Sequence, residues 1–375
     1  MSLLRSTPVP HRGRGCAAPV ALRDVRVFTL LPIAAAFVIL LVSIALPAAA
    51  MAIALPVAIL GAILGVPHGA VDHLVPGWLG LDGRSVRRRG RHPARVRHVR
   101  FLSAYVAAAL AGTVSLLFAP TPTLLAFLVL SAAHFGWGEV VTSAERSGRA
   151  TFLGAGSVLI ATANGLVTVG LLVWRNPSVT DAYVRALSPT VAEGSIVTAS
   201  AGVLGTLAVV TAALVVLLRR RRLLEAGELV LLTSVFMFCP PLAAFGVYFG
   251  LWHAVRHSGR LLDLLRADEA GSGVPDRGWG SSFARLARLS SAPTAAALLA
   301  VLVLVALRGV TTLSAEVSVL LAVTFPHAGV VARLDVARSR RVSSLRASSP
   351  PSDTLGLRGL APGGSTAAAA RATTR

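Results

Sequence analysis

Six of the nine histidines lie within or at the end of long apolar runs, where an imidazole without a partner is costly. His253 and His257 are four residues apart in the segment WHAVRH. On a helix this spacing places both rings on one face, one turn apart. The others are His68 and His73 in GVPHGAVDHL, His134 in SAAHFGWGE and His327 in TFPHAGVV.

A metal ion is the ligand that this pattern favours. Two imidazoles at i and i+4 can hold one ion, and an all-nitrogen donor set suits iron, copper or zinc. Asp72 follows His68 by four residues and is expected either to orient a ligand imidazole or to coordinate itself. His73 is rotated away, which predicts an interfacial or outer role. His327 is expected to be either an outer residue that supports a ligand or an extra ligand. For His73 or His327 alone, a structural hydrogen bond to a carbonyl or hydroxyl is an equally good interpretation.

The elements that must carry these histidines are membrane helices. The chain has 375 residues, of which 54% are hydrophobic and 14% charged, and its mean hydropathy is +0.72. Runs of about 20 apolar residues recur, so we predict an all-α polytopic membrane helix bundle with about eight to ten spans. The predicted runs are 28–50, 52–77, 101–119, 121–143, 151–174, 195–218, 227–239, 241–263, 290–308 and 314–336.

The basic residues predict the orientation of the bundle. The formal net charge is +20, and the arginines gather in the N-terminal arm, in residues 84–100, at 219–222 and in the C-terminal tail. Alternating helices place all four segments in the cytoplasm, as the positive-inside rule requires. This distribution favours topology signals and lipid contact over nucleic-acid binding. We therefore predict a multi-pass plasma-membrane protein with both termini cytoplasmic.

Three regions follow from this assignment. Residues 1–27 form a basic cytoplasmic arm, 28–336 form the membrane domain, and 337–375 form a basic tail that we expect to be disordered. Within the membrane domain, five of the histidines (all but His73) lie about 12–16 residues from the outer ends of their helices, or ~18–24 Å deep. A shared depth on four helices predicts that the five rings meet.

Small residues and aromatic residues accompany the histidines. Glycines at four-residue spacing on the second and eighth runs predict close packing of these helices. The aromatic stripe beside WHAVRH is expected to be either ordinary core or the wall of a tunnel for a long apolar substrate. The glycines are Gly61, Gly65 and Gly69 on one run and Gly246 and Gly250 on the other, and the stripe comprises Phe245, Phe249 and Trp252.

The motifs PHGAVDH, HFG, WHAVRH and PHAGVV, in this order, resemble those of the bacteriorhodopsin-related-protein-like family of membrane β-carotene 15,15′-dioxygenases, over about residues 55–335. The resemblance implies one mononuclear non-haem Fe(II) held by four histidines, and O₂-dependent cleavage of β-carotene to two retinals. It also implies membrane lipids as surroundings and a functional link to a retinal-binding rhodopsin. Glu139 stands near the place where the family carries an aspartate, which leaves its role open. The four implied ligands are His68, His134, His253 and His257.

Two other functions fit the same residues. A transporter could use buried His and Asp residues as a proton relay, and a carrier could bind retinal or a carotenoid without chemistry. Metal content separates the dioxygenase from a transporter, and loss of carotene colour separates it from a carrier. A di-iron desaturase would need additional clustered histidines that the chain lacks.

Overall fold

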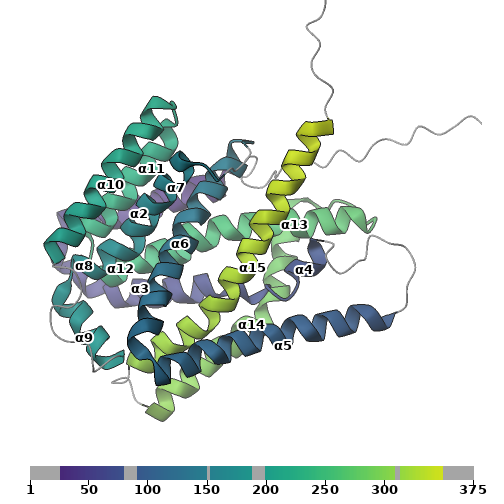
Figure 1. Ribbon diagram of the computed structural model, residues 1–375, viewed down its shortest axis with the longest axis horizontal. Coiled ribbons are helices and arrows are strands. Elements are labelled where there is room, and N and C mark those ends of the chain that lie inside the picture. Colours follow the sequence, from purple (N-terminus) through teal and green to yellow (C-terminus); the bar gives the residue numbers. More distant parts are fainter. Residues whose placement is uncertain (1–25, 80–90, 150–152, 188–198, 309–312, 349–375) are drawn as a thin grey trace, which may run out of the picture.

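The computed structural model describes residues 26–79, 91–149, 153–187, 199–308 and 313–348. Within these ranges all regular elements are helices and no strand occurs, which confirms the all-α polytopic helix bundle (Figure 1). Residues 1–25 of the N-terminal arm and residues 349–375 of the tail lie outside the described residues.

The helices follow the predicted runs, with several shifted ends. α5 begins at Arg91, so part of the basic segment 84–100 is helical, and α3 ends at Ala70, before His73. The elements are α2 (Val27–Ala45), α3 (Pro47–Ala70), α4 (Val75–Trp78), α5 (Arg91–Phe118), α6 (Pro120–Arg146), α7 (Ala155–Gly165), η1 (Leu166–Gly170), α8 (Leu171–Trp174), α9 (Pro177–Leu187), α10 (Ala199–Arg219), α11 (Leu223–Phe238), α12 (Pro241–Gly246), η2 (Val247–His253), α13 (Ala254–Gly271), α14 (Gly278–Arg308) and α15 (Leu313–Ser348).

Proline sets the starts of the helices that carry the site. Pro47, Pro120 and Pro241 each occupy the first position of α3, α6 and α12. Proline is suited to this position because its φ is already helical and its missing N–H has no intrahelical acceptor there. Each proline also ends the preceding helix, so two neighbouring apolar runs become separate helices.

Six helices are long and apolar enough to cross a membrane, by length and composition, within the part of the chain that the structure describes. This supports a multi-pass membrane protein, while the expected total of eight to ten spans remains a prediction. Many leucine, valine and isoleucine side chains on their outer faces are exposed, as expected for a lipid-facing surface. The six spans are Val27–Ala45, Pro47–Ala70, His98–Leu116, Pro120–Arg146, Ala155–Trp174 and Ala199–Arg219.

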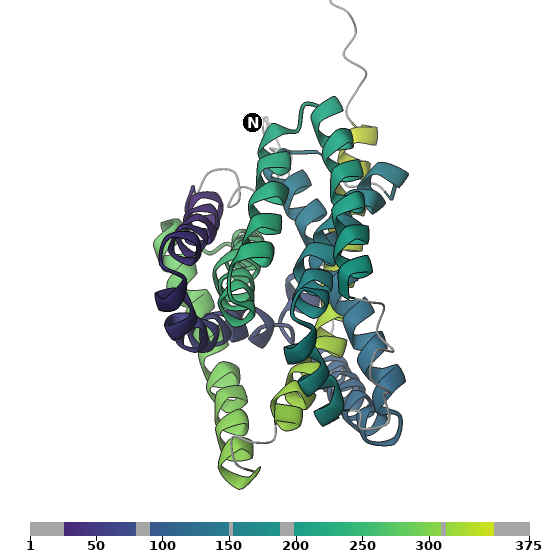
Figure 2. The ribbon, with the colours of Figure 1, turned by 90° about the vertical axis from the view of Figure 1, so that its left-hand side faces the viewer.

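Two apolar cores hold the bundle together. The larger core joins α2, α6, α7, α10, α11 and η2, and the α10–α11 pair that contributes to it is visible in Figure 2. The smaller core joins α4, α13, α14 and α15. Along the continuous η2–α13 segment, Trp252 belongs to the first core and Leu261 to the second. His253 and His257 therefore lie where the two cores adjoin.

The tail differs from the prediction at its start. Residues 337–348 were expected to be disordered, but they continue α15. Arg338 explains the extension, because its Nη1 donates to Glu145 Oε2 at 2.8 Å and its Nη2 donates to the Arg260 carbonyl at 2.8 Å. These contacts to α6 and α13 stabilise the helix beyond the apolar run.

Candidate metal centre

Close helix crossings bring the histidine-bearing segments together. A Cβ atom on Gly61 would lie 2.2 Å from the Gly246 carbonyl oxygen, and one on Gly250 would lie 2.5 Å from the Gly61 carbonyl oxygen. Neither contact is tolerable, so only glycine permits α3 to approach α12 and η2 this closely. The predicted glycine seams are thus the contact that places His68 beside His253.

A second glycine crossing positions α6. A Cβ atom on Gly136 would lie 2.0 Å from the Ala161 carbonyl oxygen, and one on Gly165 would lie 2.3 Å from the Ala132 carbonyl oxygen. Gly136 and His134 are two residues apart, so this crossing of α6 and α7 fixes the backbone that carries His134. Glycine contacts thus fix the crossing of α3 with α12 and η2, and the crossing of α6 with α7.

Five histidines meet, as the shared depth predicted. The ring centroids of His68 lie 5.3 Å from His253, 5.4 Å from His257 and 5.0 Å from His327. His134 lies 5.1 Å from His253 and 5.2 Å from His327. We call His68, His134, His253, His257 and His327 the histidine cluster.

The i,i+4 pair is arranged as its spacing predicted. The His253 and His257 rings are nearly parallel, with an interplanar angle of 10° and centroids 6.1 Å apart. His253 is the last residue of the π-helical segment η2, and π-helical turns are frequent at functional sites. Phe135 packs edge-on against His253 with centroids 4.9 Å apart, so the residue after His134 also supports the cluster.

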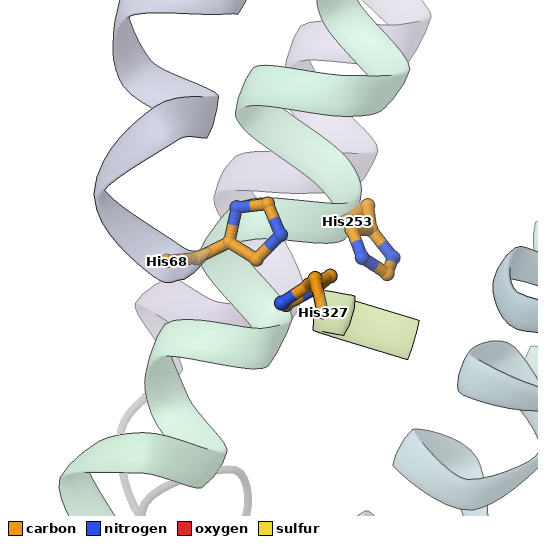
Figure 3. Close-up of side chains that lie close together, drawn as sticks. All are labelled: His68, His253 and His327. Atoms are coloured by element: carbon orange, nitrogen blue, oxygen red, sulfur yellow. The ribbon is translucent and has the colours of Figure 1, made fainter. Parts of the chain in front are cut away.

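Three members of the cluster are placed to hold one ion. Ring nitrogens of His68, His253 and His327 all lie within 4.8 Å of one another, and all three residues are buried. Figure 3 shows their rings facing each other from α3, η2 and α15. His327, expected from sequence to be either an outer residue or an extra ligand, therefore lies among the innermost nitrogens. His134 and His257 lie against this group.

Some ring nitrogens of the cluster have no hydrogen-bond partner among the described residues. The Nδ1–H of His68 donates to the Gly65 carbonyl, and the Nδ1–H of His327 donates to Asp72 Oδ2 at 2.8 Å. Among the described residues, Nε2 of His253 and Nε2 of His327 are buried without a hydrogen-bond partner. Buried polar atoms are rarely left unpaired, and neutral imidazole nitrogens are good ligands for a divalent transition metal. The residues therefore fit a metal ion.

Asp72 contacts the histidine cluster, whereas the neighbouring His73 does not. Asp72 was expected to orient a ligand imidazole or to coordinate the metal itself, and its Oδ2 accepts hydrogen bonds from His327 at 2.8 Å and from the hydroxyl of Tyr105 at 3.1 Å. His73 lies beyond the end of α3 and contacts His98, with ring centroids 6.0 Å apart. Its Nδ1–H donates to the Ala70 carbonyl at 3.1 Å. His73 therefore lies outside the histidine cluster.

The aromatic stripe divides into two environments. Phe245 and Phe249 stack with centroids 5.5 Å apart, and Phe249 lies 5.6 Å from His68. A Cβ atom on Gly65 would lie 2.1 Å from the Phe249 ring, so this glycine makes the space that the ring occupies. Trp252 is fully buried and its indole N–H donates to Glu139 at 3.1 Å, which makes it part of the core.

A layer of buried charges adjoins the cluster. Glu139 accepts hydrogen bonds from Tyr248, Trp252 and Arg256, the last at 2.7 Å. Arg256 also donates to Glu228 at 2.8 Å, and Arg260 donates to Glu145 at 2.9 Å. We call the following residues the ionic layer: Glu139, Glu145, Arg146, Glu228, Arg256, Arg260, Asp335 and Arg338.

Sequence reasoning missed two features of this site. Tyr105 lies 33 residues from Asp72 on a helix with no motif, so no sequence signal pointed to it. Arg256 of WHAVRH and Arg260 after it were given no role from sequence, although both are almost fully buried. The signal for these arginines was available, because a charged residue inside an apolar helix requires a partner.

Comparison with known proteins gives the family. Residues 59–335 match the sequence profile of the family described as beta-carotene 15,15′-dioxygenase. Over 311 residues the chain is 28% identical to the probable beta-carotene 15,15′-dioxygenase Blh of Halobacterium salinarum, covering 73% of this chain and 81% of that protein. No solved structure matches. The matched range contains the whole histidine cluster, and the chain belongs to the beta-carotene 15,15′-dioxygenase family.

Proposed function

We propose that this chain cleaves β-carotene at its central 15,15′ double bond with O₂, giving two molecules of all-trans-retinal. The observation that carries the proposal is the cluster of five histidines, four of them buried and two of these with an open Nε2 atom, in a chain of this family. In the reaction the central C=C bond and the O–O bond break and two C=O bonds form. One O₂ molecule supplies both carbonyl oxygens, so no proton or external electron is consumed.

Iron is the proposed metal, and the histidine cluster is its proposed donor set. His68 and His253 belong both to the four ligands that the resemblance implies and to the three innermost residues of the structure. We add His327 because its Nε2 is open and its Nδ1–H is held by a carboxylate, an arrangement that recurs around metal-bound histidines. When bound, Fe(II) among neutral imidazoles supplies a site for O₂ activation beside an alkene.

The protein's own task is to position the polyene and exclude water. The cluster has no hydroxyl or thiol nucleophile, and the cleavage needs no general acid or base. Phe245 and Phe249 are the proposed wall for the substrate, because their stacked rings lie beside His68 on a segment that contacts α3. A site among membrane helices suits a substrate that partitions into lipid. A retinal-binding rhodopsin is the proposed consumer of the product.

The proposed location is the plasma membrane, with both termini in the cytoplasm. The arginines at 219–222 support this orientation, because they form the short turn between α10 and α11 and carry no neighbouring acid until Glu225. A reporter that is active only in the cytoplasm should be active when fused after residue 220. A reporter that is active only outside the cytoplasm should be inactive at the same position. The reverse result would overturn the topology.

Expression in a bacterium that makes β-carotene tests the proposed reaction. Cells that contain the full chain in their membranes should turn from orange to pale, and chromatography should find retinal in the extract. Cells with an empty vector, and cells starved of iron while expressing the chain, should stay orange. Colour that persists with normal membrane levels of the protein contradicts the proposal, and carotenoid that copurifies uncleaved would indicate a carrier.

A further inference from the structure

Tyr105 is a contact of the site to which neither the motifs nor the family match assigns a role. It lies on α5, is half-buried, and packs with Phe101 against the smaller apolar core. Its hydroxyl donates to Asp72 Oδ2 at 3.1 Å. A tyrosine hydroxyl that packs against an apolar core usually finds a hydrogen-bond partner, and here the partner is a carboxylate of the site.

Asp72 joins three separate parts of the bundle at one atom. Its carboxylate comes from the turn after α3, and Oδ2 accepts from Tyr105 of α5 and from His327 Nδ1 of α15. α5 and α15 pack side by side (Figure 1), so the two donors reach the carboxylate from adjacent helices. Asp72 Oδ1 has no partner among the described residues. The two hydrogen bonds at Oδ2 therefore restrict the rotation of the Asp72 carboxylate.

The orientation of His327 depends on this carboxylate. A carboxylate oxygen accepts hydrogen bonds, so in a neutral His327 ring the proton is held on Nδ1 and the lone pair lies on Nε2. That Nε2 is the open atom that belongs to the innermost group with His68 and His253. A change in the angle of the carboxylate would therefore turn the lone pair of His327 relative to the other two nitrogens.

We propose that Tyr105 is a positioning residue for the metal centre, which acts through Asp72 on His327. The hydroxyl fixes the carboxylate, the carboxylate fixes the tautomer and angle of the His327 ring, and the ring presents Nε2 to the ion. The proposal rests on the metal centre of the proposed function. Removing a group that orients a ligand typically lowers metal affinity by about 10–100-fold.

A structural role makes a different prediction. If Tyr105 served only to fasten α5 to the turn after α3, its loss would lower the melting temperature of the metal-free protein and leave the affinity for metal unchanged. Affinity measured on the metal-free full-length chain in detergent distinguishes the two roles. Co(II) is the probe, because its visible absorption bands report both binding and the number of ligands.

The experiment compares Tyr105→Phe, Asp72→Asn, the double variant and Thr113→Val with the unaltered chain. Thr113→Val is the matched control, because it also removes a half-buried hydroxyl from α5, one that donates to the Ala109 carbonyl of the same helix. We expect Tyr105→Phe to weaken Co(II) binding about tenfold and to alter the absorption bands. Thr113→Val should bind as the unaltered chain does. The double variant should match Asp72→Asn, because the hydroxyl acts only through the carboxylate.

Each outcome bears on the proposal. Co(II) affinity of Tyr105→Phe within twofold of the unaltered chain overturns it, and so does an additive loss in the double variant. If Tyr105→Phe also lowers the melting temperature of the metal-free chain, the comparison of Asp72→Asn with the double variant decides between the two roles. The proposal requires these two variants to bind Co(II) with equal affinity. An unaltered chain that binds no Co(II) would instead contradict the metal centre of the proposed function.

Discussion

The histidine cluster and the ionic layer share three helices, yet their polar atoms are satisfied differently. α6 carries His134 and Glu139, α13 carries His257 and Arg260, and α15 contributes to both sets. In the ionic layer every carboxylate has an arginine nitrogen at 2.5–2.8 Å. In the cluster, two Nε2 atoms have no partner among the described residues.

This difference separates a structural layer from a ligand site. In the ionic layer each buried carboxylate is paired with an arginine of the protein itself, although Arg256 Nε has no hydrogen-bond partner among the described residues. Imidazoles that point their open nitrogens at each other are incomplete without a ligand that accepts several lone pairs. The comparison predicts that changes in the ionic layer reduce stability, whereas changes in the cluster reduce metal binding and activity. Four substitutions and one matched control test it.

Arg260→Met should have the largest effect and should act on stability. Arg260 is 1% exposed and donates to both Glu145 and Asp335, so its loss leaves buried carboxylates with fewer partners. We expect the free energy of unfolding to fall by about 3–5 kcal/mol. Chemical denaturation of the purified chain in detergent measures it.

Arg285→Met is the matched control for this change. Arg285 pairs with Glu269 at 2.9 Å, but its side chain is 51% exposed. An exposed pair contributes less than about 1 kcal/mol, so the two arginine-to-methionine changes should differ clearly. Equal losses of stability would show that the ionic layer is not a structural unit.

His253→Ala should abolish activity and iron retention. His253 has an open Nε2 and lies within the innermost group, so its loss removes a nitrogen that water replaces poorly. We expect retinal formation to fall by more than about 100-fold, beyond the loss typical of an outer group. Iron is measured by elemental analysis and retinal by chromatography at matched expression. Normal iron content and normal bleaching would place the metal elsewhere.

Glu139→Gln should have an intermediate effect on stability and little effect on iron. Gln keeps the shape of Glu139 and one acceptor oxygen, while Arg256 keeps its contact with Glu228. Loss of one charged hydrogen bond in a buried site costs about 1–3 kcal/mol. Denaturation and iron content measured on the same preparation test this. Loss of iron at unchanged stability would assign Glu139 to the metal centre and break the comparison.

His73→Ala should have the smallest effect. His73 is part-buried, and its ring contacts His98 rather than the cluster. We expect retinal formation and iron content within about threefold of the unaltered chain, below the loss expected for a group that orients a ligand. Assays run beside His253→Ala give the comparison. A loss as large as that of His253→Ala would extend the metal centre to the turn after α3.

Much of the fold could be predicted from sequence, because apolar runs of helical length have one stable form in lipid. Backbone groups in a bilayer must bond within the segment, so each run becomes a helix. Proline fixed several helix starts, and the glycine seams gave the closest crossings. The ends were less predictable: α15 continues past residue 336 because Arg338 finds partners on α6 and α13, which no local pattern indicates.

The sequence by itself determined that His253 and His257 share a helix face and that five histidines lie at one depth. Both follow from the fixed rise and rotation of a helix. Only the tertiary structure decided that His327 belongs to the innermost group, that Asp72 serves His327 rather than His68, and that Tyr105 reaches Asp72. These contacts join residues up to 255 positions apart. They depend on how helices cross and rotate against each other, which is set by packing between helices and not by the period within any one of them.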